Sequence, residues 1–295
     1  MRRRIFLQAA STSLLAAAGR AQTPPPKKAK ITSSVMLWTL KGSFEHKLET
    51  AARAGIQSVE LVGEYSGWTD ADIARVNKLL GSFRLGIDLI SAVPGWKKRP
   101  VSMVDPAQRD NLLREVRKNI GCARKLHAPM LLLISGLAMP GRPRRQQYAS
   151  LLESSKRCAE LAEKAGVKVL LEPLNSKIAN PGPFLSTCGE ALKLIREVDS
   201  PHLRLLFDVY HEQVETGSVL DAIRQAAPYA EVFHVADVPG RHEPGTGTID
   251  YPKVYQAIEE TGFEGYIAME YLPTRDPVAS LIASVDQMRA ALAAA

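Results

Sequence analysis

The chain has 295 residues, of which 45% are hydrophobic, so it is long enough to bury the core of one large α/β domain. Its formal charge of +7 includes four arginines within the first 20 residues, which leaves about +3 for the remainder and no clustered basic face for nucleic acid. After the N-terminal segment, no apolar stretch has the length that a membrane-spanning helix needs.

The N-terminus has the form of an export signal. Arg3 and Arg4 open the sequence RRIFLQ, a weakly apolar run follows, and Ala21 ends a small-residue site that a signal peptidase can cleave. We expect residues 1–21 to be a twin-arginine signal peptide, cleaved or kept as an anchor, that directs the protein to the periplasm. The alternative is a basic tail on a cytoplasmic protein. Residues 22–30 form a linker rich in proline and lysine, and residues 31–295 form one domain.

From residue 31 onward, short apolar runs typical of buried strands alternate with segments whose apolar residues recur at helical spacing. In chain order, the predicted strands are 31–40, 58–62, 84–90, 130–136, 168–174, 203–210, 231–236 and 265–270. The predicted helices that follow them are 44–54, 70–80, 106–127, 145–165, 186–198, 218–227, 251–261 and 277–294. Gly55, Gly166 and Gly262 each end a helix just before the next strand.

Strands and helices that alternate in this way predict a (β/α)8 TIM barrel, folded as a single domain. The alternative architecture is an open doubly wound sheet, which would carry a glycine-rich nucleotide loop after its first strand. The sequence at that point is WTLKGS (38–43), which lacks the pattern. We therefore favour the barrel.

Four of the later apolar runs end in a side chain that can bind a metal ion. They are Glu172, Asp208, His234 and Glu270, spaced 36, 26 and 36 residues apart. In a parallel barrel, the carboxyl ends of neighbouring strands meet at one mouth, so these side chains should face a common point. One imidazole and three carboxylates suit one divalent cation, Mg²⁺ or Mn²⁺ first and Co²⁺ as a further option.

Glu172 could instead be purely structural. A lone carboxylate in an apolar strand is costly to bury, so it needs a partner, and a lysine or arginine on a neighbouring strand would serve. We favour the metal site because ligand-type residues recur at the same place in the three runs that follow.

From Ile31 onward, the chain resembles the xylose isomerase-like sugar phosphate isomerase/epimerase superfamily, and within it the hydroxypyruvate isomerase group. The most specific match is HVADVPGRHEPGTG (234–247), supported by LLEPLN (170–175), FDVYHEQ (207–213) and AMEYLP (268–273) in the same order. By that resemblance, the metal ligands are Glu172, Asp208, His234 and Glu270, of which the two glutamates are also the catalytic acid/base pair.

The resemblance implies an enzyme that isomerises a small α-hydroxycarbonyl compound through a cis-enediolate, with hydroxypyruvate to tartronate semialdehyde as the leading reaction. Removing a proton beside a carbonyl needs a base, and a metal chelated by both substrate oxygens stabilises the enediolate. His234 departs from the better-known bacterial hydroxypyruvate isomerases, which carry glutamine there, and matches the ketose 3-epimerases. A ketose 3-epimerase or another sugar isomerase is therefore the alternative.

Five further residues are predicted to bind the small-molecule substrate. His211 lies just beyond a strand end, and Arg241 and His242 lie in the loop after His234, where an arginine can pair with a carboxylate. Trp38 and Glu60 lie near the ends of the first two strands. The alternatives are a solvated loop histidine for His211, a structural arginine for Arg241, and barrel filling for Trp38 and Glu60.

Two other functions suit this chain less well. Abasic-site endonucleases of the same superfamily hold three zinc ions and use many histidines to do so. This chain has six histidines in all, and only a few of them are expected near the barrel mouth. A periplasmic sugar-binding barrel without turnover would not need two opposed glutamates. The predicted partner is a small-molecule substrate, with no nucleic acid and no membrane beyond the signal peptide, and assembly into a homo-oligomer is left open.

Overall fold

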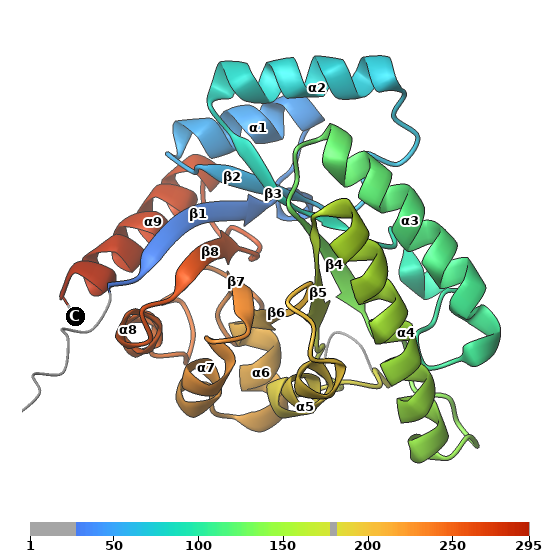
Figure 1. Cartoon of the computed structure of the whole chain (residues 1–295). Helices are drawn as coiled ribbons and strands as arrows, with labels where there is room; N and C mark the ends of the chain where they lie inside the picture. The colour runs from blue at the N-terminus through green and yellow to red at the C-terminus, as the bar shows by residue number, and fades with distance from the viewer. Residues whose placement is uncertain (1–27, 178–181, 295) are drawn as a thin grey trace, which may run out of the picture.

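Eight parallel strands close into a barrel in the computed structural model, which describes residues 28–177 and 182–294. The strands follow one another around the barrel in chain order, and the last pairs with the first (Figure 1). They are β1 (Lys30–Met36), β2 (Ser58–Leu61), β3 (Gly86–Ser91), β4 (Met130–Ile134), β5 (Lys168–Glu172), β6 (Leu203–Asp208), β7 (Ala230–Val235) and β8 (Glu264–Met269). The predicted TIM barrel is confirmed.

Helices cover the outside of the barrel and connect its strands (Figure 1). They are α1 (Phe44–Arg53), α2 (Asp70–Phe83), α3 (Arg109–Lys125), α4 (Arg144–Ala165), α5 (Cys188–Val198), α6 (Val209–Thr216), α7 (Leu220–Ala226), α8 (Tyr251–Glu260) and α9 (Pro277–Ala294). Short 3-10 helices are η1 (Leu37–Thr39), η2 (Trp96–Lys98) and η3 (Pro106–Gln108). In the described part of the chain, no helix combines the length and apolarity that crossing a bilayer requires.

Local sequence explains where several helices begin and end. Thr69 caps α2, and its side chain and that of Asp72 form a reciprocal capping box. α4 ends at Gly166, whose φ of 69° lies in the left-handed region that glycine enters without steric cost. The predicted start and end of α4 agree with the structure to within one residue.

Side chains along each strand alternate between the barrel interior and the layer that faces the helices. In β7, Val232 packs inside the barrel and Phe233 packs in the outer core. The interior cluster consists of Met36, Leu89, Met130, Leu132, Leu170, Leu206, Val232 and Ala268. Each predicted metal ligand follows a member of this cluster by two residues, so it shares the same inward face.

The ends of the barrel's first strand differ slightly from the prediction. β1 begins one residue early, at Lys30, and ends at Met36, because the chain turns into η1 there. Thr39 supports that turn by donating its hydroxyl to the carbonyl of Met36 at 2.8 Å. The predicted signal peptide, residues 1–21, and most of the predicted linker lie outside the described residues, so export to the periplasm stays a prediction.

The prediction for β6 was two residues too long and missed α6. The strand ends at Asp208, whose Oδ1 accepts the backbone N–H groups of Tyr210 (2.8 Å) and His211 (3.1 Å) and so caps α6. Val209 and Tyr210 continue the apolar run of the strand, which hid the helix start in the sequence.

The layer between barrel and helices offers a test of packing. Ile267 on β8 is fully buried, whereas Ile282 on α9 is 41% exposed. Truncating a buried isoleucine leaves a cavity, so Ile267→Ala should lower the free energy of unfolding by roughly 2–5 kcal/mol. Ile282→Ala is the matched control and should change it by about 0.5 kcal/mol or less. Guanidinium unfolding followed by circular dichroism measures both, and equal losses would contradict this packing.

Candidate metal centre and active site

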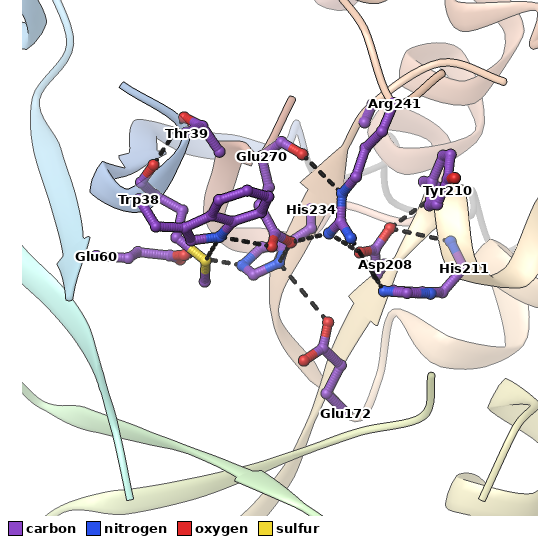
Figure 2. Close-up of polar contacts among 12 residues, drawn as sticks. Trp38, Thr39, Glu60, Glu172, Asp208, Tyr210, His211, His234, Arg241 and Glu270 are labelled. Atoms are coloured by element: carbon purple, nitrogen blue, oxygen red, sulfur yellow. Dashed lines mark hydrogen bonds and ion pairs between the residues drawn. The ribbon is translucent and has the colours of Figure 1, made fainter. Parts of the chain in front are cut away.

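Four side chains that could hold a metal ion meet at the carboxyl ends of β5 to β8. They are Glu172, Asp208, His234 and Glu270, and their ligand atoms all lie within 4.8 Å of one another. All four residues are buried. Figure 2 shows them gathered around a common point, with Arg241 and Trp38 beside them. The structure thus brings together the whole set of predicted ligands.

Strand register explains this convergence. Asp208 pairs with His234 across β6 and β7, and His234 pairs with Ala268 across β7 and β8. Glu270 lies two residues beyond Ala268, so it projects from the same face. A shift of one residue in either pairing would turn a ligand away from the barrel interior.

The imidazole of His234 lies between carboxylates on both sides of the ring. Its Nδ1 is 2.7 Å from Glu270 Oε2 and 3.9 Å from Glu172 Oε1, and its Nε2 is 2.9 Å from Glu60 Oε2. Burial would lower the pKa of His234, but the charges of Glu60 and Glu270 outweigh this effect and raise it well above its ordinary value. In this arrangement the imidazolium offsets part of the negative charge around it.

The two glutamates of the cluster have opposite tendencies. Burial raises the pKa of Glu172 well above its ordinary value, and the charge of Glu270 adds to the rise. Burial acts in the same direction on Glu270, but the charges of Arg241 and His234 outweigh it and hold the pKa of Glu270 below its ordinary value. Environments that move the pKa values of two neighbouring carboxyl groups in opposite directions are typical of acid/base pairs.

The donor set fits a divalent cation. Ligand atoms about 2.0–2.2 Å from a small ion lie at most about 4.4 Å apart, so atoms spread over 4.8 Å need only a small inward movement. Three carboxylates and one imidazole, without a thiolate, match Mg²⁺ or Mn²⁺, with Co²⁺ as a further option. The four side chains would hold the ion, and the ion would supply positive charge next to the oxygens of a substrate.

Glu60 lies deeper in the barrel than a substrate-binding residue would. It is fully buried, contacts His234, and is absent from the walls of the cavity at the cluster. Burial and the charge of Glu60 raise the pKa of neighbouring Asp88 well above its ordinary value, and Asp88 Oδ1 accepts from Ser34 Oγ at 2.7 Å. In this structure Glu60 contacts the imidazole of His234 from inside the barrel, and its contact with a substrate stays a prediction.

Replacing Glu60 tests whether it orients His234 for a metal ion. Hydrogen-bond partners of ligand histidines fix the ring, and their loss typically weakens metal binding by about 10- to 100-fold. Glu60→Leu should therefore lower the affinity for Mn²⁺ by roughly that factor in isothermal titration calorimetry. Glu60→Gln keeps an acceptor oxygen and is the matched control, with a smaller expected loss. Unchanged affinity in a folded Glu60→Leu variant would remove Glu60 from this role.

Asp208 connects the cluster to His211, which lies in the first turn of α6. The Oδ1 atom of Asp208 caps the helix, and its Oδ2 faces Arg241 at 3.1 Å. His211 Nδ1 accepts the backbone N–H of Asn175 at 3.1 Å, so the proton of the neutral ring sits on Nε2. Burial lowers the pKa of His211 and favours this neutral form. His211 lines the cavity, where its Nε2–H can donate to a ligand.

Arg241 contacts both the cluster and two aromatic rings. Its guanidinium lies 2.6 Å from Glu270 Oε2, and its Nε donates to the carbonyl of the same residue at 3.1 Å. The guanidinium carbon is 5.6 Å from the ring centroid of Trp38 and 5.1 Å from that of Tyr210. Burial opposes its charge, but Glu270 and Asp208 outweigh this effect and raise the pKa of Arg241. Arg241 therefore stays positive at the cavity wall.

Asp237 holds the loop that carries Arg241, a role that sequence reasoning missed. Its buried carboxylate accepts backbone N–H groups at 2.8–3.1 Å from Val238, Gly245, Gly247 and Ile249. Gly247 is required for this approach, since a Cβ there would lie 2.5 Å from Asp237 Oδ1. The segment HVADVPG contained this aspartate, but sequence alone does not separate a loop-holding carboxylate from a ligand.

Trp38 and His242 were predicted together and are placed differently. Trp38 lines the cavity, and its Nε1 donates to Glu270 Oε1 at 3.0 Å. His242 does not line the cavity, and its Nδ1 lies 2.8 Å from the carbonyl of Leu272. His242 therefore joins two loops, and its role as a substrate contact stays a prediction.

The cavity at the cluster has a volume of about 240 Å³. Its polar walls include Glu172, His211, Arg241 and Glu270, and its apolar walls include Met36, Leu132 and Leu174. A few convergent polar groups in a mainly apolar hollow are typical of a small-molecule site.

Comparison with known proteins agrees with this geometry. A family model described as xylose isomerase-like TIM barrel matches residues 48–291. The chain belongs to this family. Hydroxypyruvate isomerase of Escherichia coli (strain K12) is 30% identical over 241 residues, which cover 81% of this chain and 91% of that protein. A putative hydroxypyruvate isomerase of Homo sapiens is 29% identical over 242 residues, with coverage of 80% and 86%.

A solved structure shares the architecture. D-psicose 3-epimerase from Clostridium cellulolyticum H10, determined with D-tagatose, matches with a TM-score of 0.76 over 89% of this chain and 99% of that chain. The sequence identity is 18%, so this likeness shows the fold alone. The family relationship predicted from the strand-end motifs is confirmed by the family model and the curated relatives.

Proposed function

We propose that this protein is a metal-dependent isomerase that moves a proton between neighbouring carbons of a small α-hydroxycarbonyl compound through a cis-enediolate. The observation that carries the proposal is the placement of Glu172 and Glu270, two buried glutamates with opposite pKa tendencies at one cavity. A removed proton must be returned to the neighbouring carbon, and two carboxyl groups with opposite pKa tendencies can divide these two steps. Ligand binding without turnover would not need this pair.

The other residues at the cavity position the substrate. Arg241 and the Nε2–H of His211 can donate hydrogen bonds to substrate oxygens and so hold the hydroxycarbonyl end between the glutamates. One glutamate then takes a proton from the hydroxyl-bearing carbon, and the other delivers a proton to the former carbonyl carbon. The hydroxyl proton passes to the former carbonyl oxygen, which leaves the new carbonyl at the first carbon. The Trp38 N–H fixes one oxygen of Glu270 during this transfer. A bound divalent cation supplies a Lewis acid next to the oxygens that gain negative charge.

Hydroxypyruvate is the leading substrate, and tartronate semialdehyde is the corresponding product. Two curated relatives that match over most of their length are named for this substrate. Arg241 adds physical support, because a guanidinium at the cavity wall can pair with the carboxylate of hydroxypyruvate.

A ketose 3-epimerase is the second candidate, and His234 favours it. His234 stands where the better-known bacterial hydroxypyruvate isomerases carry glutamine, and where ketose 3-epimerases carry histidine. Epimerisation would use the same two glutamates, since it removes a proton from one face of a carbon and returns a proton to the other. The two reactions therefore differ in substrate rather than in the groups that transfer the proton.

Proton exchange tests the proposed chemistry directly. Mn²⁺-loaded protein with hydroxypyruvate in D₂O should incorporate deuterium and form tartronate semialdehyde, as followed by proton NMR, and EDTA should stop both. Glu172→Gln and Glu270→Gln should each slow exchange by at least about 100-fold, because each removes a proton-transfer group. The exposed Glu49→Gln is the matched control and should exchange at the wild-type rate.

The absence of exchange with hydroxypyruvate would remove it as substrate. The same assay with D-psicose and D-tagatose would then decide the second candidate. Binding of these sugars with no exchange at all would favour a sugar-binding barrel without turnover.

Arg241→Lys tests the pairing with a substrate carboxylate. Lysine keeps the charge but loses the two-pronged geometry, so kcat/KM for hydroxypyruvate should fall about tenfold more than kcat/KM for uncharged dihydroxyacetone. Comparing the two substrates separates the loss of carboxylate binding from any disturbance of Asp208 and Glu270, which would affect both alike. The exposed Arg53→Lys is the control. An equal loss for both substrates would show that Arg241 does not read the carboxylate.

A further inference from the structure

A second cavity, here called the distal cavity, adjoins the one at the metal ligands. It has a volume of about 320 Å³ and lies at the carboxyl ends of β3 and β4, between segments 91–108 and 132–140. The two cavities share the wall residues Ser91, Trp96, Lys97, Leu132 and Ile134. Because these side chains border both spaces, the two cavities are direct neighbours.

The distal cavity has mainly apolar walls. They include Val93, Val101, Leu112, Leu133, Leu137 and Met139. Its charged residues already have partners, since Arg99 forms an ion pair with Glu115 at 2.5 Å and Asp105 with Arg142 at 3.0 Å. Lys97, at the shared wall, is exposed to solvent. The cavity therefore suits an uncharged, apolar group better than a carboxylate or phosphate.

A three-carbon acid does not use this space. Its reacting end must lie beside Glu172 and Glu270, in the cavity of about 240 Å³, which leaves the 320 Å³ of the distal cavity empty. Small-molecule sites of roughly 300–1,000 Å³ hold ligands considerably larger than three carbons. An apolar group in the distal cavity would leave water and gain the free energy of burial.

We propose that, in addition to three-carbon acids, the protein accepts substrates that carry an apolar substituent beyond the α-hydroxycarbonyl end, and that the distal cavity binds this substituent. The inference rests on the proposed function, because Glu172 and Glu270 place the reacting end. It extends the substrate range to hydroxyketones or keto sugars that bear an alkyl or aryl group. Binding energy from a remote part of the substrate raises kcat/KM when it holds the reacting carbons in place.

Two uncharged hydroxyketones test the inference. Hydroxyacetone has only the reacting end, whereas 1-hydroxy-4-phenylbutan-2-one adds a phenyl group that can reach the distal cavity. With Mn²⁺-loaded protein in D₂O, kcat/KM for deuterium exchange at the hydroxymethyl carbon should be roughly 10- to 100-fold higher for the phenyl compound, as burial of an aromatic ring predicts. Equal values for the two compounds would overturn the inference.

Two variants locate the gain. Ala138→Trp fills the distal cavity, and Leu137→Asp places a charge at a wall position that is 43% exposed and tolerant of a polar side chain. Each should remove most of the phenyl compound's advantage and leave exchange of hydroxyacetone within about twofold of wild type. The exposed Ala71→Trp on α2 is the matched control for Ala138→Trp and should keep the advantage. A gain that survives both cavity variants would place the phenyl group elsewhere.

A binding measurement separates this inference from the proposed function. Saturation-transfer NMR detects contact between the protein and the phenyl protons whether or not exchange occurs. Contact that disappears in Ala138→Trp and Leu137→Asp, without exchange of any compound, would support the distal cavity and reject the isomerase chemistry. Exchange of hydroxypyruvate without phenyl contact would do the reverse.

Discussion

Several buried negative charges lie close together at the barrel mouth, and the surrounding residues must compensate them. The buried carboxylates are those of Glu60, Glu172, Asp208 and Glu270. Carboxylates this close repel one another strongly away from water, so each needs a positive partner, a proton or hydrogen bonds. Arg241 and His234 supply positive charge, and a divalent ion held by the four side chains would supply more. The cluster has more carboxylates than positive side chains, which favours the binding of a cation.

The same side chains that could hold an ion also hold the fold. Asp208 places one oxygen at the cluster and uses the other to start α6, which carries His211. The side chain of Glu270 accepts a hydrogen bond from Trp38 and forms an ion pair with Arg241. The backbone carbonyl of Glu270 also accepts a hydrogen bond from Arg241. Geometry at the cluster is therefore tied to the position of the residues that would bind substrate oxygens.

Most of the fold and the four side chains that could hold a metal ion could be predicted, because the pattern that reveals them is local. A strand buried on both faces reads as a short apolar run, and a polar side chain at its end is conspicuous there. The depth of Glu60 could not be predicted, since it depends on the pairing of Glu60 with Met36 of β1, which belongs to the interior cluster. Sequence alone also does not show which of two neighbouring loop residues faces the cavity. Arg241 lines the cavity, and His242 does not.

The shared wall at Trp96 and Leu132 divides the barrel mouth into two regions with different freedom to change. The ligands and glutamates come from β5 to β8, where each side chain has several partners, whereas the distal cavity is formed by β3, β4 and their loops and contains none of them. Substitutions in the β3 and β4 loops can therefore alter which molecules are accepted without disturbing proton transfer. Such a barrel can diversify its substrates through evolution while its chemistry stays constant.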